Sequence, residues 1–232
     1  MKAYTTEENN ALAKPAAGFI FDFDGVVVDS LSTHLRAWES ASTALFGMPL
    51  VNPSRLIGYS TTSIGMLLAK EAGDPTRAPE LVRLKREALE SQKDSVEALP
   101  GTKDLFEKLA VNNLPWGIAS NANRAFITQT LATLGLDVPL VVSVEDVRNP
   151  KPAPDVFLLC ATRLGISHLD HKRTIVFEDS VHGIHAAVKA GMFAVGLTTQ
   201  HSAVVLRKAG AQLTCESLAD VVAGNWLDEP PV

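Results

Sequence analysis

The chain alternates short apolar runs with longer segments of helical periodicity. Five apolar runs are short enough to be buried strands, at residues 18–24, 115–120, 140–145, 174–179 and 193–197. Four other segments carry apolar residues three and four positions apart, as helices with one buried face do, at residues 102–113, 123–135, 153–165 and 180–191. Three of these end near Gly135, Gly165 or Gly191, where a glycine can cap a helix. Strand alternating with helix predicts an α/β fold with a parallel sheet covered on both faces.

Residues 30–95 interrupt this alternation. The strand pattern stops, and amphipathic stretches such as STHLRAWESASTALFG and PELVRLKREALESQK follow one another. We interpret this region as a helical cap domain inserted after the first strand, and Pro100–Gly101 as the turn that returns the chain to the sheet. The predicted organisation is a loosely ordered stretch at 1–14, a core made of 15–29 and 96–232, and a helical cap at 30–95.

Composition narrows the class of protein. With 232 residues, 46% of them apolar, the chain can bury one good-sized core and a smaller unit. A net charge of -5 argues against a basic face for nucleic acid. Cys160 and Cys215, each in an apolar or mixed helical-looking context without CxxC spacing, indicate core packing rather than a disulfide or zinc site. With no signal peptide and no long apolar run, we expect a soluble cytoplasmic protein without membrane partners.

Polar side chains follow the predicted strands at the point where each one ends. In an open parallel sheet, ligands bind outside the carboxyl ends of the strands, so such residues are the first candidates for a site. The candidates are Asp22 and Asp24, Ser120 and Asn121, Lys151, and Glu178 with Asp179.

A site built from these residues requires a cation. Two carboxylates about 4 Å apart repel by roughly 4 kcal/mol at an effective dielectric near 20, and Asp22, Asp24, Glu178 and Asp179 would bring up to four together. Oxygen ligands without histidine or cysteine favour Mg²⁺, which also accepts water and substrate phosphate as ligands. Lys151 adds a positive charge suited to phosphate, and Ser120 a hydroxyl donor.

These residue types suit phosphoryl transfer in two steps. Asp22 would accept the phosphoryl group on its carboxylate, forming an aspartyl-phosphate. Asp24 would protonate the leaving oxygen and then take a proton from the group that attacks the intermediate. Lys151 and Mg²⁺ would neutralise the developing charge.

At this point the sequence resembles the haloacid dehalogenase (HAD) superfamily, in particular its phosphatases and mutases with a helical cap. The resemblance extends from about residue 18 to 220. The motifs, in order, are DFDGVVVDS from Asp22, ASN at 119–121, KPAPDVF from Lys151 and FEDSVHGIHAAVKAGM from Phe177. The resemblance implies a Rossmann-like core with a cap, Asp22 as nucleophile and Asp24 as acid/base. It also implies Mg²⁺ held by the Asp22 carboxylate, the Asp24 carbonyl and Asp179, with Glu178 alongside.

Further features of the resemblance concern the reaction and the substrate. True dehalogenases of the superfamily lack an acid two positions after the nucleophile, so Asp24 favours phosphoryl transfer. The cap is similar to that of β-phosphoglucomutase at His34, Trp38 and Gly58, but Thr61 stands where the mutase has an arginine for the distal phosphate. Hydrolysis of a sugar phosphate is therefore favoured, and a mutase remains the alternative because Lys85 or Arg55 could replace that arginine.

The remaining candidates have competing interpretations. Gly25 lets the backbone turn beside the phosphate, and Asn121, Lys85 and Arg124 are candidate substrate contacts. His34 and Trp38 are either cap contacts to substrate or packing neighbours one helical turn apart. A non-catalytic protein of this fold would lack the nucleophile or the lysine, and phosphonate hydrolysis would need a cap lysine earlier than Lys70. The expected partner is a small phosphorylated metabolite, bound by a monomer or homodimer.

Overall fold

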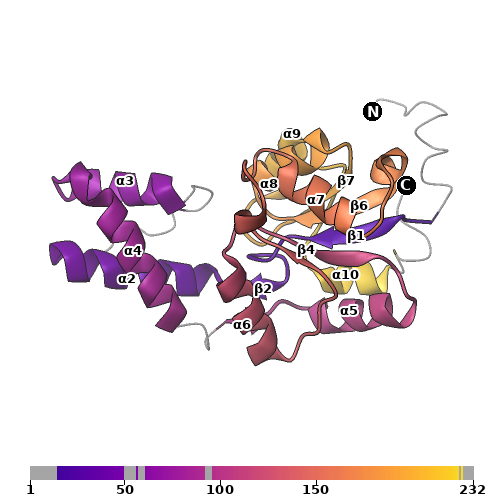
Figure 1. Cartoon of the computed structure of the whole chain (residues 1–232), viewed down its shortest axis with the longest axis horizontal. Coiled ribbons are helices and arrows are strands. Elements are labelled where there is room, and N and C mark those ends of the chain that lie inside the picture. The colour runs from indigo at the N-terminus through magenta and orange to yellow at the C-terminus, as the bar shows by residue number, and fades with distance from the viewer. Residues whose placement is uncertain (1–14, 50–55, 57–60, 92–95, 225, 227–232) are drawn as a thin grey trace. The chain divides into compact units, whose positions relative to one another are not determined.

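The computed structural model describes residues 15–49, 56, 61–91, 96–224 and 226, and these form two units (Figure 1). The smaller unit spans Asp29–Glu97, and the larger contains the described parts of 1–28 and 98–232. The sequence pattern predicts the boundaries between core and cap after residue 29 and after residue 95. The chain crosses between the units in two short strands that pair with each other, β2 (Val28–Asp29) and β3 (Glu97–Ala98).

A six-stranded parallel sheet forms the centre of the larger unit. Its strand order is β5-β4-β1-β6-β7-β8. The strands are β1 (Gly18–Phe21), β4 (Trp116–Ala119), β5 (Val141–Val142), β6 (Thr174–Glu178), β7 (Phe193–Leu197) and β8 (Leu213–Cys215). The chain moves outward from β1 through β4 to β5 and then crosses to β6 on the other side of β1. The order in which the chain adds strands therefore reverses at β1, and open parallel sheets bind ligands at such a point.

Helices cover both faces of this sheet. In Figure 1, α7, α8 and α9 lie above the sheet and α5 and α10 lie below it. The helices of this unit are α5 (Thr102–Val111), α6 (Arg124–Leu134), α7 (Asp155–Arg163), α8 (Val181–Lys189), α9 (Ala203–Ala209) and α10 (Leu218–Ala223), with the short 3₁₀ turns η4 (Val144–Asp146) and η5 (His168–Arg173). This arrangement confirms the predicted α/β class.

The two faces of the sheet have different cores. On one face Phe21 stacks on Phe177 at 4.9 Å between ring centroids and meets Phe106 of α5 edge-on at 5.2 Å. On the other face Ile20 and Val176 pack among the small and branched side chains of α7 and α8. Both faces of β1 are thus fully buried, which is why the strand is a continuous apolar run rather than an alternating one.

Two details differ from the sequence pattern. Cys215, in a mixed sequence context, lies in β8, a three-residue strand at the sheet edge. Cys160 is helical, in α7, and both cysteines are free and buried. The elements after β7 were not predicted because α9, β8 and α10 are too short to show a period.

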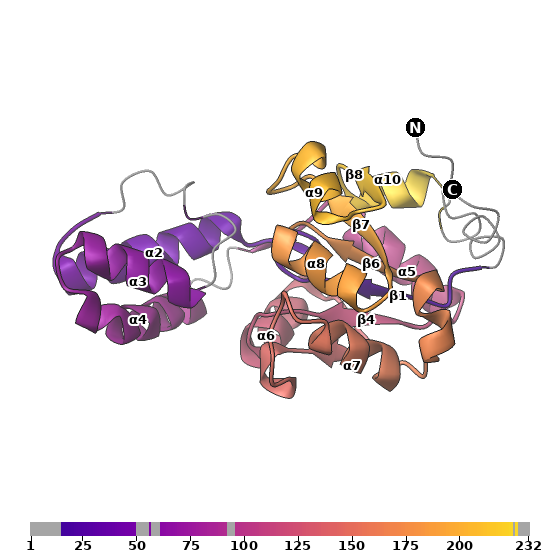
Figure 2. The same cartoon turned by 90° about the horizontal axis from the view of Figure 1, so that it is seen from above.

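The smaller unit is helical. It contains α2 (Leu31–Phe46), α3 (Thr61–Glu71), η2 (Pro75–Arg77) and α4 (Ala78–Ser91), with α4 packed against both α2 and α3 (Figure 2). Its core consists of Trp38, Ala41, Leu56, Ile64, Leu68 and Leu81. Among the described residues of both units, no helix has the length and hydropathy to cross a bilayer.

Candidate active site

The turn after β1 carries the first two candidate residues. Asp22 follows Phe21 directly, and its amide donates to the Phe177 carbonyl of β6 at 2.9 Å, so the backbone at Asp22 still belongs to the sheet. The chain then reverses: Gly25 has a φ of +78°, and its amide donates to the Val28 carbonyl at 2.8 Å. A side chain at Gly25 would be strained and would place its Cβ 1.9 Å from Asp179 Oδ2. Glycine therefore lets the turn approach Asp179.

Lys151 lies between two buried carboxylates. Its Nζ is 2.8 Å from Asp22 Oδ1 and 2.8 Å from Glu178 Oε1. The exposed fraction is 8% for Lys151 and Asp22 and zero for Glu178, so these charges interact with little screening by water. The ammonium also lies 4.5 Å from the centre of the Phe157 ring. The lysine is thus held at the carboxyl ends of β1 and β6.

Residues after β4 make hydrogen bonds with the loop that carries Lys151. The Asn121 side chain pairs with the Lys151 backbone: Oδ1 accepts from the Lys151 amide at 3.0 Å, and Nδ2 donates to the Lys151 carbonyl at 3.3 Å. Ser120 is 2% exposed, and its Oγ accepts from the Ala122 amide at 3.1 Å, which leaves its hydroxyl proton for another acceptor. The contacts of Asn121 orient the lysine.

Glu178 ends β6 and is held on the side opposite Lys151. Its Oε2 accepts from the Ser180 amide at 2.7 Å and from the Ser180 hydroxyl at 2.9 Å. Ser180 in turn caps α8, because its Oγ accepts from the Gly183 amide. A Cβ at Gly183 would stand 1.7 Å from Glu178 Oε1. Gly183 therefore leaves the space that the Glu178 carboxylate occupies.

Three carboxylates converge at this point. Asp22, Glu178 and Asp179 each place one oxygen within 4.8 Å of the others, and Asp179 is only 1% exposed. Two unit charges at that separation repel by about 3 kcal/mol at an effective dielectric near 20. Lys151 balances one of these charges, and the oxygen-only donor set fits a hard divalent cation such as Mg²⁺.

The acid–base properties of the cluster follow from burial and mutual repulsion. Burial raises the pKa of Asp22 to about 7, Glu178 and Asp24 act in the same direction, and Lys151 opposes them. Burial, with Glu178 and Asp22, also raises the pKa of Asp179 well above its usual range. Burial alone would lower the pKa of Lys151, but Asp22 and Glu178 outweigh it and raise that pKa. The lysine is therefore charged. Its single positive charge does not offset the burial and mutual repulsion of the carboxylates.

The segment after β7 also reaches this cluster, although no sequence pattern singled it out. The Thr199 hydroxyl lies 2.6 Å from the Gly25 carbonyl and 3.3 Å from Asp179 Oδ2, and His201 Nδ1 lies 3.0 Å from the Asp179 carbonyl. The signal that could have found it is positional: TTQHS follows an apolar strand, as the other site segments do.

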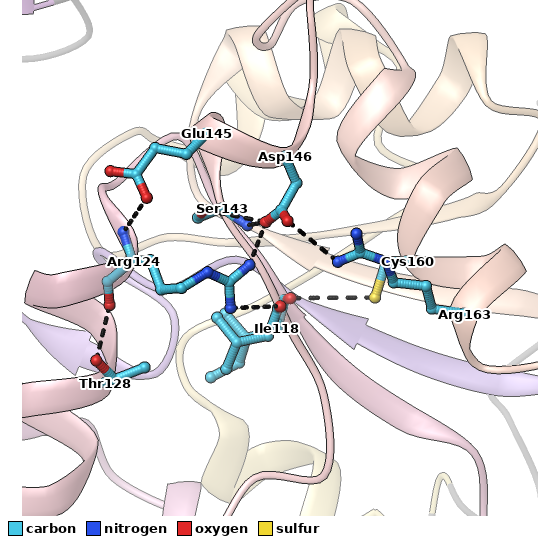
Figure 3. Close-up of polar contacts among 9 residues, drawn as sticks. Ile118, Arg124, Thr128, Ser143, Glu145, Asp146, Cys160 and Arg163 are labelled. Carbon is cyan, nitrogen blue, oxygen red and sulfur yellow. Dashed lines mark hydrogen bonds and ion pairs between the residues drawn. The ribbon is translucent and has the colours of Figure 1, made fainter.

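Arg124, a candidate substrate contact, lies in a network of ion pairs and hydrogen bonds (Figure 3). Its guanidinium pairs with Asp146 Oδ2 and donates to the Val141 carbonyl of β5 at 3.2 Å. Asp146 also accepts from Arg163 of α7 at 3.2 Å and from the Ser143 amide at 2.8 Å. The contacts of Arg124 are thus with structural elements, and a role toward substrate stays a prediction.

This network predicts a stability effect centred on Asp146. Partial burial opposes ionisation, but hydrogen bonds from Ser143 and the neighbouring Arg163 and Arg124 lower the pKa of Asp146 below its usual 3.8. Its charge therefore contributes stability above pH 3.8 that is lost as the pH falls through its lower folded value. We expect Asp146→Asn to lower the free energy of unfolding by about 1 to 2 kcal/mol at pH 7.

Urea unfolding monitored by circular dichroism measures this effect. The difference from the unsubstituted protein should shrink as the pH drops below about 4. The neighbouring Glu145→Gln is the control, since Glu145 makes one 3.4 Å contact with the Arg124 amide. A loss as large in Glu145→Gln would contradict the assignment to Asp146.

The cap candidates lie together in the smaller unit. Lys85 Nζ is 3.0 Å from His34 Nδ1 and 5.7 Å from the centre of the Trp38 ring. Lys85 is 3% exposed and Trp38 2%, so both are packed within the helical unit. Thr61 begins α3, and Lys70 lies in its last turn. Arg55 and Gly58, the other two residues of the cap comparison, lie outside the described residues.

Comparison with known proteins decides the family. Residues 19–197 match the haloacid dehalogenase-like hydrolase family. This protein belongs to that family. A fructose-1-phosphate phosphatase of Escherichia coli, YqaB, is 35% identical over 77% of this chain and 95% of its own. Hexitol phosphatase A of the same organism is 30% identical over 78% of this chain and 82% of its own.

A solved structure agrees with this assignment. A hydrolase from Pseudomonas syringae is 31% identical, covers 93% of this chain and all of its own, and superposes with a TM-score of 0.77. Membership in the HAD family, predicted from four motifs, is thereby confirmed, as is the prediction of a phosphoric monoester hydrolase of the HAD type.

Proposed function

We propose that this protein is a Mg²⁺-dependent phosphatase that hydrolyses a small sugar phosphate through an aspartyl-phosphate on Asp22. The observation that carries the proposal is the position of Lys151, 2.8 Å from both Asp22 and Glu178 and beside a cluster of three buried carboxylates. A buried nucleophile next to a phosphate-binding cation is what phosphoryl transfer to a carboxylate requires.

The donor set supports Mg²⁺ as the cofactor. The ligands would be the Asp22 and Asp179 carboxylates and the Asp24 carbonyl, with Glu178 alongside. Such an ion would neutralise charge on the phosphoryl oxygens and on the carboxylates. The raised pKa values of Asp22 and Asp179 are consistent with this, since burial and the neighbouring carboxylates raise both pKa values although Lys151 lies nearby.

The chain's own residues would perform the two steps. Asp22 attacks phosphorus as the bond to the leaving oxygen breaks, and Asp24 gives that oxygen a proton. Asp24 then takes a proton from water, which attacks the aspartyl-phosphate and releases inorganic phosphate and free Asp22. Lys151 stabilises negative charge on the phosphoryl group, and the Ser120 hydroxyl donates to it. Asn121 and Gly25 position the lysine loop and the turn after β1.

The relatives support the sugar-phosphate class, since the two described above are named for fructose 1-phosphate and for hexitol phosphates. His34 would contribute from the cap to recognition of the leaving group, with the buried Lys85 and Trp38 positioning it, and Arg124 would contribute from α6. These four assignments concern specificity and can fail without affecting the reaction proposed for Asp22.

The test measures two products at once. The protein and Mg²⁺ are incubated with fructose 1-phosphate, and separately with β-glucose 1-phosphate and a trace of the 1,6-bisphosphate, while free phosphate and glucose 6-phosphate are quantified. Phosphate release that is lost with EDTA and restored with Mg²⁺ is the expected result. Glucose 6-phosphate without phosphate release would identify a mutase instead. Turnover unaffected by EDTA would contradict the proposed cofactor.

A further inference from the structure

The loop that follows β7 makes three contacts with the candidate metal site. The Thr199 hydroxyl meets the Gly25 carbonyl at 2.6 Å and Asp179 Oδ2 at 3.3 Å. His201 Nδ1 meets the Asp179 carbonyl at 3.0 Å. This loop therefore contacts both the turn after β1 and the residue after β6, two segments more than 150 residues apart in the sequence.

The two contacts of Thr199 differ in strength. A hydroxyl has one proton, so the 2.6 Å contact with the Gly25 carbonyl is the principal hydrogen bond and the 3.3 Å contact with Asp179 is the weaker one. His201 contacts the backbone carbonyl of Asp179 and not its carboxylate. Other contacts must therefore orient the Asp179 carboxylate. The Thr199 side chain thus meets both that carboxylate and the turn carrying Asp24.

The space around Gly25 shows how closely these parts fit. A Cβ there would lie 1.9 Å from Asp179 Oδ2 and 2.8 Å from Gln200 Nε2. The turn, the carboxylate and the loop after β7 thus pack against one another with no room for a methyl group. A small movement of the Gly25 carbonyl would change the separation between the Asp24 carbonyl and Asp179.

We propose that Thr199 is a positioning residue for the metal site. Its hydroxyl holds the Asp24–Gly25 turn at a set distance from the Asp179 carboxylate, so that the Asp24 carbonyl and Asp179 can bind the same ion. The inference rests on the Mg²⁺ site of the proposed function. Residues that orient metal ligands typically change metal affinity 10- to 100-fold when they are replaced.

A neighbouring threonine provides a matched control. Thr198 precedes Thr199 on the same loop, but its hydroxyl contacts the Cys215 carbonyl of β8 at 3.3 Å, away from the site. Thr199→Val and Thr198→Val remove one hydroxyl each and keep the β-branched shape. Thr199 is exposed and Thr198 is half-buried, so neither side chain belongs to the core and we expect both variants to fold.

Mg²⁺ affinity, measured by isothermal titration calorimetry and by the Mg²⁺-dependent rise in Tm, is the readout. We expect Thr199→Val to weaken Mg²⁺ binding about tenfold or more, and Thr198→Val to stay within about twofold of the unsubstituted protein. Thr199→Ser, which keeps the hydroxyl, should retain most of the affinity. Thr199→Ala, which adds no bulk, should reproduce the loss. Without Mg²⁺, the Tm of both valine variants should be similar.

The possible results distinguish the positioning role of Thr199 from the proposed Mg²⁺ site itself. Equal affinity in Thr199→Val and the unsubstituted protein overturns the positioning role alone. Equal weakening by Thr198→Val also overturns it, because the loop would then act as a whole. An unsubstituted protein that binds no Mg²⁺ overturns the proposed metal site and this inference with it.

Discussion

Replacement of Asp22 by asparagine is expected to lower kcat by about 10⁴-fold or more while leaving the protein folded. The amide cannot form an acyl-phosphate, so the two-step route through the carboxylate is lost. The fold should survive because burial raises the pKa of Asp22 to about 7 and already disfavours its charged form. The uncharged amide in that position therefore removes repulsion with the neighbouring carboxylates.

Phosphate release under Mg²⁺ saturation, together with thermal unfolding, checks this expectation. Asp137→Asn is the matched control, because Asp137 is an exposed aspartate in the loop after α6 and should keep full activity. A residual rate within tenfold of the unsubstituted protein would remove Asp22 from the role of nucleophile. A large decrease in Tm would instead show that the Asp22 carboxylate stabilises the fold.

Replacement of Lys151 by methionine is expected to abolish turnover and to lower the free energy of unfolding by about 3 to 5 kcal/mol. Lys151 is the cation that pairs with both Asp22 and the fully buried Glu178. Methionine has nearly the same length but no charge, so it leaves two buried carboxylates without their cation. Removing one partner of a buried ion pair lowers the free energy of unfolding more than replacing the whole pair by apolar residues does.

Denaturant unfolding with and without Mg²⁺ tests this second prediction. Lys189→Met is the control, since that exposed lysine makes a single 2.9 Å contact with the Pro152 carbonyl. Added Mg²⁺ should recover part of the stability of Lys151→Met by supplying positive charge to the same carboxylates, without recovering activity. Unchanged stability would mean that the carboxylates are neutral in the protein, contrary to the ion pairs described.

The larger features of the fold could be predicted because each leaves a local pattern. The strand around Ile20 is buried on both faces and therefore appears as a continuous apolar run, as does the strand around Val176. The helix after Asn123 begins at a side chain that caps it and ends at Gly135, in the left-handed conformation. The last elements could not be predicted, since β8 has three residues and α10 six.

The candidate site was predictable to the extent that its residues end strands. Asp22, Lys151 and Glu178 could be grouped because parallel strands bring their carboxyl ends to one edge of the sheet. The direct contacts of Lys151 with both carboxylates required the structure. So did the space at Gly183, since a glycine in a helix gives no sign of which side chain lies against it.

The sequence by itself determined the α/β class, the helical insertion and the residue types of the site, because periodicity, turn residues and motif order are local properties of the chain. The tertiary structure decided which groups touch: that Lys151 joins Asp22 to Glu178, that Arg124 pairs with Asp146, and that Thr199 meets Gly25 and Asp179. These contacts join residues up to 174 positions apart. They depend on how strands and loops pack in space, which no short stretch of sequence encodes.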